Sequence, residues 1–200
     1  MVSASSLLTT VFGVPLGLVL VVTRRGHIME SPVFNSIFGA IVNAVRSVPF
    51  IIFLVFISPF TRQLVGASIG PTAAIVALTL AALVFMARLA ETALLEVGHG
   101  VIEAAQSAGA TNWQIIRHVL LPEARPGLIQ AVTITVISLI GYSAMAGAIG
   151  GGGLGDLAVR YGYQRYQIDI MLVTVIILMA AVQGLQSLGD YLARKFDRRF

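Results

Sequence analysis

The sequence is poor in charge: Asp, Glu, Lys and Arg make up only 11% of its 200 residues, whereas a soluble domain carries about 25%. Hydrophobic residues make up 57% of the chain, and its mean hydropathy is +0.90. A folded surface with so few charges would associate in water. The composition therefore excludes an ordinary soluble domain and indicates a protein of the lipid bilayer.

Cysteine is absent, and Lys195 is the only lysine. The absence of cysteine excludes disulfides and any metal or redox site built on thiolates. The phosphate-binding motif G-x-x-x-x-G-K-[ST] does not occur, so the chain has no such nucleotide-binding loop of its own. The net charge of +4 does not indicate nucleic-acid binding, because the basic residues flank apolar runs instead of sharing one soluble face.

Patterns that could carry catalysis or metal binding are weak. Gly141-Tyr142-Ser143 has the form of an intramembrane nucleophile turn, but no histidine base is expected near Ser143. The run Gly150–Gly155 satisfies G-x-G-x-x-G, but it follows an apolar span instead of a strand. We interpret it as a flexible turn or as a surface for a docking protein. We predict no metal site, because the histidines are scattered along predicted loops: His27, His99 and His118.

Five apolar stretches are long enough to consider as membrane spans, since a helix needs about 20 residues to cross the hydrocarbon core. The first contains Pro15, but no positive residue precedes it and no cleavage site follows, so we interpret it as a retained span. The second is longer than needed and either tilts or begins as an interfacial segment. The predicted fold is one all-α membrane domain over residues 1–200. Its five transmembrane helices cover residues 5–22, 34–60, 70–90, 126–149 and 168–190.

Lys and Arg are distributed unequally between the two sets of loops that alternate across the membrane. The larger set is predicted to be cytoplasmic, because cytoplasmic loops carry an excess of these residues. The N-terminus is then outside and the C-terminus inside. The larger set is Arg24, Arg25, Arg88, Arg117, Arg125, Arg194, Lys195, Arg198 and Arg199, and the smaller set is Arg62, Arg160 and Arg165.

A polar segment, residues 92–125, separates the third span from the fourth, and we call it the elbow. Glu103-Ala104-Ala105 predicts a short helix that Gly109 ends or bends. Thr111 and Gln114 have the spacing of a capping box for a second short helix, which Pro122 is predicted to stop. The apolar stripe expected on this second helix is Trp113, Ile116, Val119 and Leu120. The elbow is either an interfacial loop or a surface that a partner grips.

The spacing from Glu103-Ala104-Ala105 to Gly109, Val119 and Leu121-Pro122 resembles the EAA motif of ABC importer permeases. Val119 is a mild departure, because the family usually has isoleucine there. In that family the short helix is a coupling helix that sits in a cleft of a cytoplasmic ATPase subunit. The resemblance implies this set of coupling residues: Glu103, Ala104, Ala105, Gly109, Ala110, Leu121 and Pro122.

Other segments narrow the resemblance to permeases for amino acids, and among these to methionine importers. Residues 43–50, NAVRSVPF, resemble a second-span motif of amino-acid permeases. Residues 141–145, 150–156 and 161–163 resemble methionine importer permeases. The resemblance implies transport of methionine, in both stereoisomers, across a bacterial inner membrane. It also implies a homodimer, two ATPase subunits that hold ATP and Mg²⁺, and an extracytoplasmic methionine-binding protein.

On this interpretation the chain has no cofactor and no catalytic residue, and it transports by alternating access. A permease for another amino acid or small solute remains an alternative. A stand-alone secondary carrier is a weaker one, since it would need acids or ion ligands within the spans. The nine acids lie in loops or near span ends.

Polar and flexible residues inside the spans are candidates for the transport pathway. Arg46 costs about 2.5–3.5 kcal/mol in hydrocarbon, so it either lines the pathway or snorkels to the interface. Pro49 can kink the second span beside Asn43. Met145 either closes a pathway between two copies or is ordinary core packing. The candidate set is Asn43, Arg46, Pro49, Tyr142, Ser143 and Met145.

Two further pairs are predicted from spacing. Gly13 and Gly17 allow close helix contact, which we assign to packing within the chain in preference to a dimer contact. Arg88 and Glu91 stand three residues apart and are expected to pair. That pair either stabilises a helix end or braces the elbow against the third span.

Overall fold

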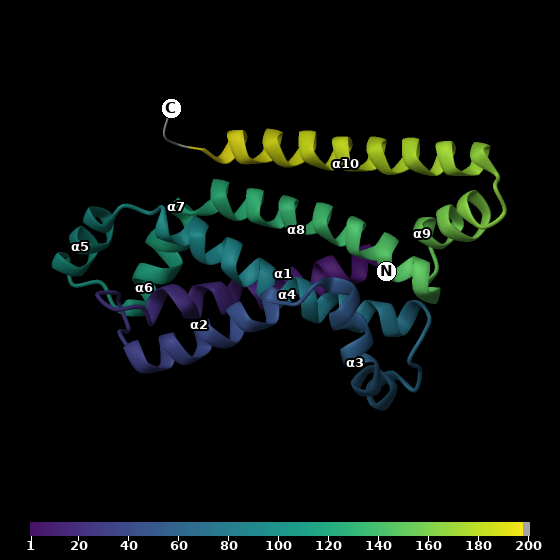
Figure 1. Ribbon diagram of the computed structural model, residues 1–200. Helices are drawn as coiled ribbons and strands as arrows, with labels where there is room; N and C mark the ends of the chain where they lie inside the picture. The colour runs from purple at the N-terminus through teal and green to yellow at the C-terminus, as the bar shows by residue number, and fades with distance from the viewer. Residues whose placement is uncertain (198–200) are drawn as a thin grey trace.

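The computed structural model describes residues 1–197, and within that range it contains helices and turns but no strand. The predicted all-α fold is confirmed. The long helices lie side by side, with α10 along one side of the bundle and α2 and α3 along the other (Figure 1). The helices are α1 (Val2–Val22), α2 (Pro32–Ser47), α3 (Phe50–Val65), α4 (Pro71–Leu95), α5 (His99–Ser107), α6 (Asn112–Ile115), α7 (Leu121–Glu123), α8 (Arg125–Ala146), α9 (Leu154–Leu157) and α10 (Ile168–Phe196). The π-helical turns are η1 (Ile116–Leu120), η2 (Gly147–Gly151) and η3 (Ala158–Tyr163).

Four of the predicted spans correspond to single helices that are long and apolar enough to cross a bilayer: α1, α4, α8 with η2, and α10. The remaining one, residues 34–60, is divided between α2 and α3, whose axes differ by 109°. The chain breaks there because Pro49 has no N–H and forces the residue before it out of helical conformation. Val48 accordingly has φ −80° and ψ 125°. The kink predicted at Pro49 is present, and it makes this stretch a bent pair instead of one tilted helix.

Helix α1 packs against α4 through its glycines. A Cβ on Gly13 would lie 2.7 Å from Cγ of Met86, and a Cβ on Gly17 would lie 2.6 Å from the carbonyl oxygen of Ala87 and from Cβ of Ala90. Since real Cβ atoms do not approach so closely, only glycine permits this helix spacing. The predicted contact within the chain is therefore confirmed.

Helix α10 packs mainly on α8 and on the segment just before it, and most of its surface is exposed. The two long helices meet at Gly189, where an added Cβ would lie 2.2 Å from Oγ1 of Thr133. Gly162 in η3 similarly approaches Met171. These contacts attach α10 to one side of the bundle (Figure 1).

The bundle has two distinct ends. One end carries α5, α6, α7 and the last turn of α10, and we call it the elbow end (Figure 1). The opposite end carries α9, η3 and the start of α1. Helices α1, α4, α8 and α10 run between the two ends, so the start of the described chain and the elbow are separated by the length of the bundle (Figure 1).

The glycine-rich run after α8 lies at the end opposite the elbow. It continues α8 into η2, which is kinked at Ile149 and Gly150, where φ is −111° and +91°, and positive φ follows at Gly152 and Gly153. Gly155 then returns against α8, because an added Cβ there would lie 2.2 Å from the carbonyl oxygen of Ala144. The run is thus a turn packed on its own helix, and in the described residues no strand precedes it.

Candidate coupling site and pathway residues

The first elbow helix, α5, ends in a hydrogen-bonded turn centred on Gly109. The N–H of Gly109 donates to the carbonyl of Gln106 at 2.9 Å, and that of Ala110 donates to the carbonyl of Ala105 at 3.1 Å. This pair of bonds is a Schellman motif, which requires a left-handed residue after the helix. Gly109 supplies it with φ +78°. The prediction that Gly109 ends the helix is confirmed.

The second elbow helix begins with the predicted capping box. The backbone N–H of Thr111 donates to Oε1 of Gln114 at 2.8 Å, and the N–H of Gln114 donates back to Oγ1 of Thr111. These bonds satisfy donors that a helix start leaves unpaired. The helical segment continues through the π-helical turn η1 into α7 and ends at Glu123, one residue beyond the end predicted at Pro122.

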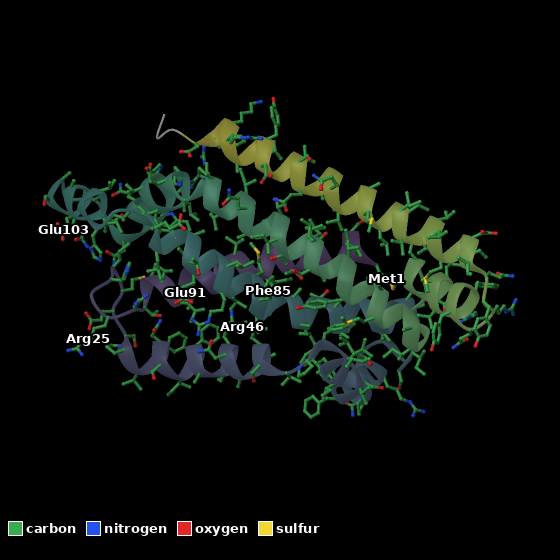
Figure 2. The ribbon with its side chains drawn as sticks, turned by 45° about the horizontal axis from the view of Figure 1, so that its top comes forward. Met1, Arg25, Arg46, Phe85, Glu91 and Glu103 are labelled. Atoms are coloured by element: carbon green, nitrogen blue, oxygen red, sulfur yellow. The ribbon has the colours of Figure 1, made fainter. Side chains whose placement is uncertain are left out.

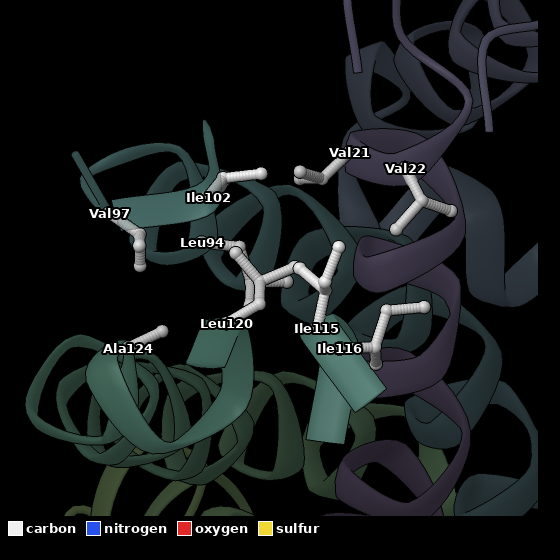
Figure 3. Close-up of a cluster of buried hydrophobic side chains, with 9 residues drawn as sticks. All are labelled: Val21, Val22, Leu94, Val97, Ile102, Ile115, Ile116, Leu120 and Ala124. Atoms are coloured by element: carbon white, nitrogen blue, oxygen red, sulfur yellow. The ribbon is translucent and has the colours of Figure 1, made fainter. Parts of the chain in front are cut away.

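A buried cluster of apolar side chains joins the elbow to the ends of α1 and α4 (Figure 3). Of the predicted stripe, Ile116 and Leu120 are buried, but Trp113 is 65% exposed. Ile115, which the prediction omitted, is fully buried. The buried face keeps the ordinary helical spacing, with Ile116 and Leu120 four residues apart, and the prediction is wrong in extending the face back to Trp113. The cluster consists of Val21, Val22, Leu94, Val97, Ile102, Ile115, Ile116, Leu120 and Ala124.

The seven residues of the predicted coupling set are divided between two faces of the elbow. Glu103, Ala104 and Gly109 are exposed, and Glu103 lies at the extreme end of the molecule (Figure 2). Ala105, Ala110 and Leu121 pack against the buried cluster, and Pro122 is half-buried in α7. The outward face therefore presents the small residues Ala104 and Gly109 beside Glu103, and the inward residues hold it against α1 and α4. Val101 and Trp113 are also exposed and lie close to this outward face in sequence. The EAA motif did not predict either residue as part of the coupling surface.

The candidate pathway residues are partly brought together near the bend after α2. Arg46 and Tyr142 line one small cavity of ≈ 40 Å³ with Phe85, and Figure 2 shows Arg46 pointing toward Phe85. Phe50, which follows Pro49, stacks on Tyr142 with ring centroids 4.7 Å apart. The bend thus places an aromatic pair from α3 and α8 beside the Arg46 side chain.

The other pathway candidates do not share this cavity. Asn43 is exposed on α2, Ser143 is half-buried, and Met145 is 49% exposed on α8. In the single chain, Met145 is thus not a core residue. Its exposed side is free to contact something outside this chain.

Arg88 and Glu91 form the predicted ion pair. A second guanidinium nitrogen of Arg88 donates to the carbonyl of Gly39 at 2.9 Å. The pair therefore ties α4 to α2 and does not brace the elbow, which corrects the second of the two interpretations. The reason is the position of the pair on α4, where the side chains meet α2 before they can reach α5.

Comparisons with known proteins decide the family. Residues 13–200 match the family described as "Binding-protein-dependent transport system inner membrane component". The chain belongs to this family. A relative from Vibrio cholerae, "Probable D-methionine transport system permease protein MetI", is 53% identical over 199 residues, which are 100% of this chain and 88% of the relative. "Methionine import system permease protein MetP" of Bacillus subtilis is 45% identical over 180 residues, 90% of this chain and 81% of the relative.

The solved structure described as "Inward facing conformations of the MetNI methionine ABC transporter: CY5 native crystal form" contains a chain that is 49% identical to this permease. It matches with a TM-score of 0.97 and covers 99% of this chain and 92% of that chain. The permease thus has the fold of a transporter membrane subunit. Its glycine run, elbow and bent α2–α3 pair belong to a transport protein and not to an enzyme.

One contact of the permease elbow, between two histidine rings, was not predicted from the sequence. The ring of His27, in the loop between α1 and α2, lies against the ring of His99 at the start of α5, with centroids 5.2 Å apart. Nδ1 of His27 is buried without a hydrogen-bond partner. Burial first, then the neighbouring His99 and Arg24, lower the pKa of His27 below 6.5. The two histidines are 72 positions apart, so no spacing rule could have joined them.

This lowered pKa makes the attachment of α5 sensitive to acid. Because the unfolded state binds a proton to His27 more readily than the folded state, stability is fully present above pH 6.5 and falls as the pH drops below it. We expect the protection factors of the α5 amides in the purified permease, which are exchange rates corrected for the pH-dependent intrinsic rate, to fall between pH 7.5 and 5.5. His27→Gln should weaken this pH dependence, and His118→Gln, on an exposed elbow residue, should leave it intact. An equal loss of protection in wild type and His27→Gln would assign the effect to other groups.

Proposed function

We propose that this chain is the membrane-spanning subunit of an ATP-driven methionine importer of the bacterial inner membrane, and that it carries both stereoisomers. The names of its relatives support methionine as the cargo. The observation that carries the proposal is the elbow, whose outward face from Glu103 to Gly109 is packed through one buried cluster onto α1 and α4. A partner that moves this face would move both helices with it.

The proposed assembly contains two copies of this chain, two ATPase subunits and an extracytoplasmic methionine-binding protein. The ATPases hold ATP and Mg²⁺, and the outward face of each elbow docks on one of them. Its small side chains suit close approach to a partner groove. The likeness to a chain of a methionine ABC transporter supports an ATPase as that partner.

The proposed orientation places the elbow end in the cytoplasm, with the N-terminus outside. The distribution of basic residues supports it: Arg25 lies at the elbow end (Figure 2), and the elbow and the last turn of α10 carry Arg117, Arg125, Arg194 and Lys195. Arg62 belongs to α3, Arg160 to η3 and Arg165 to the connection between η3 and α10, and these segments lie away from the elbow end (Figure 1). Arg198 and Arg199 lie outside the described residues.

The proposed mechanism is alternating access. ATP binding closes the two ATPases and draws the elbows together, and the buried cluster transmits this movement to α1 and α4. Methionine released by the binding protein then enters between the two copies, and hydrolysis restores the inward-facing state. Each ligand shifts the equilibrium only through its different affinity for the two states.

The proposed gate is Met145, with the Phe50–Tyr142 stack and Arg46 at the bend beside the pathway. Met145→Ala is expected to lower the amount of methionine taken up per ATP hydrolysed by a few fold, because a shortened side chain would not close the path between two copies. Met29→Ala, an exposed loop methionine, is the matched control. An uptake-to-hydrolysis ratio unchanged by Met145→Ala would remove Met145 from the gate.

The test of the function is reconstitution into liposomes of the permease, its ATPase and the binding protein, with labelled L- and D-methionine assayed separately. We expect uptake of both only when all three proteins and ATP are present. Accumulation by the permease alone would instead support a secondary carrier. A stronger response to another amino acid would support a permease for a different solute.

A further inference from the structure

An apolar groove runs between α8 and α10 at the elbow end. It has a volume of ≈ 600 Å³, within the range of about 300–1,000 Å³ that small-molecule sites occupy. Its walls are aliphatic side chains of both helices, and Phe196 lies at the end of α10. The hydroxyl of Thr133 also faces it but donates to the carbonyl of Ile129 at 2.9 Å. The groove thus presents almost no unpaired polar group along its length.

One of the residues that line this groove is a cation, and two more cations lie beside it in sequence at the end of α10. Arg125, the first residue of α8, is exposed and is the only charged residue among those that line it. Within the described residues the ion pairs are Arg88–Glu91 and Arg160–Asp156, so Arg125 belongs to neither. Arg194 and Lys195 are exposed on the last turn of α10, next to Phe196. Of the acids near these turns, Asp190 accepts a hydrogen bond from Gln186, Glu123 is exposed, and Asp197 is the C-cap residue of α10.

We propose that the groove binds an anionic phospholipid, with an acyl chain between α8 and α10 and the phosphate held by Arg125. A guanidinium binds phosphate with two parallel hydrogen bonds, which makes arginine suited to this role. Basic sites between transmembrane helices are a recurring way of holding lipid headgroups. In the proposed orientation the lipid belongs to the cytoplasmic leaflet, and that detail alone rests on the proposed function.

The other possible occupant is a second copy of the chain, and the charge argues against it. An apolar helix that filled the groove would bury Arg125 without a partner, which is costly. A lipid places its hydrocarbon in the groove and its charge at the mouth, and so matches both parts of the site. It also covers part of α10, most of whose apolar surface is exposed.

The first test measures which lipids remain on the purified transporter by native mass spectrometry. The protein is first reconstituted in nanodiscs with equal amounts of phosphatidylcholine and phosphatidylglycerol. We expect phosphatidylglycerol to be enriched about fivefold among retained lipids, the factor expected for one cation at the headgroup. Arg125→Gln should bring the two lipids close to equal retention. Arg62→Gln, at the end of α3, should leave the enrichment unchanged.

A second pair of variants tests the groove itself. Leu188→Trp places a larger ring in the groove and should reduce retention of both lipids, whereas Leu172→Trp, on a leucine of α10 with similar exposure outside the groove, should not. Equal retention of the two lipids by wild type, or an unchanged enrichment in Arg125→Gln, would overturn the proposal. So would efficient cross-linking between copies through Leu188→Cys, which the cysteine-free chain makes a clean experiment. These readouts do not depend on methionine being the cargo.

Discussion

Gly109→Val is expected to lower ATP-driven methionine uptake by the reconstituted transporter about tenfold or more. A left-handed backbone costs an ordinary L-residue about 1–2 kcal/mol, and a β-branched residue is a true outlier there. Gly109 has φ +78°, and α5 buries only Ile102 against the rest of the protein. The valine variant is therefore expected to leave the Schellman turn and to reorient α5, because little packing opposes that change.

The matched control is Gly109→Asn, since asparagine adopts the left-handed conformation with much less strain. No atom lies within 4 Å of a Cβ at this position, so neither variant creates a clash within the chain. We expect Gly109→Asn to retain most uptake and Gly109→Val to lose both uptake and co-purification of the ATPase. If the two variants transport equally, the conformation of the turn does not determine coupling.

Those parts of the elbow that depend on neighbouring residues could be predicted from the sequence. The capping box of Thr111 and Gln114 and the helix end at Gly109 follow from hydrogen bonds that span at most five residues. The kink at Pro49 likewise follows from the chemistry of one residue. In each case the spacing of the residues determines the geometry, because the chain between them has few alternatives.

Contacts between distant segments could not be predicted in the same way. The stack of Phe50 on Tyr142 depends on the 109° bend between α2 and α3, whose direction no local rule determines. The contact between His27 and His99 depends on how the elbow folds back on α1. Arg88 was expected at a helix end, yet its second partner, the carbonyl of Gly39, comes from another helix.

The buried face of the elbow shows a third kind of limit. Ile115 is buried and Trp113 is exposed because the elbow packs on α1 and α4 through the face of Ile115, Ile116 and Leu120, and the helical period alone does not say which face is turned inward. A search at the ordinary helical period assigns the larger side chain to the core. The pathway roles of Asn43, Arg46, Pro49, Tyr142, Ser143 and Met145 also stay predictions, since they concern movements between two copies.

Gly17→Ala is expected to lower the thermal unfolding midpoint of the purified permease by roughly 2–10 °C, which corresponds to an overpacking cost of about 1–3 kcal/mol. The new Cβ would lie 2.6 Å from the carbonyl oxygen of Ala87 and 2.6 Å from Cβ of Ala90. Neither atom can rotate away, because one belongs to the backbone and the other is attached directly to it. Helices α1 and α4 would have to separate, and the buried cluster beneath the elbow joins the ends of both.

Gly184→Ala supplies the same chemical change inside α10, where no atom lies within 4 Å of the added Cβ. There the gain in helix propensity, up to about 1 kcal/mol, is expected to leave the midpoint unchanged or slightly higher. A lower midpoint for Gly17→Ala and an equal or higher midpoint for Gly184→Ala would show that the cost at Gly17 comes from close packing and not from the helix propensity of alanine. Equal midpoints for both variants would mean that α1 and α4 can separate at no cost. In that case the α1–α4 unit would be too compliant to transmit the movement of the elbow as one rigid body.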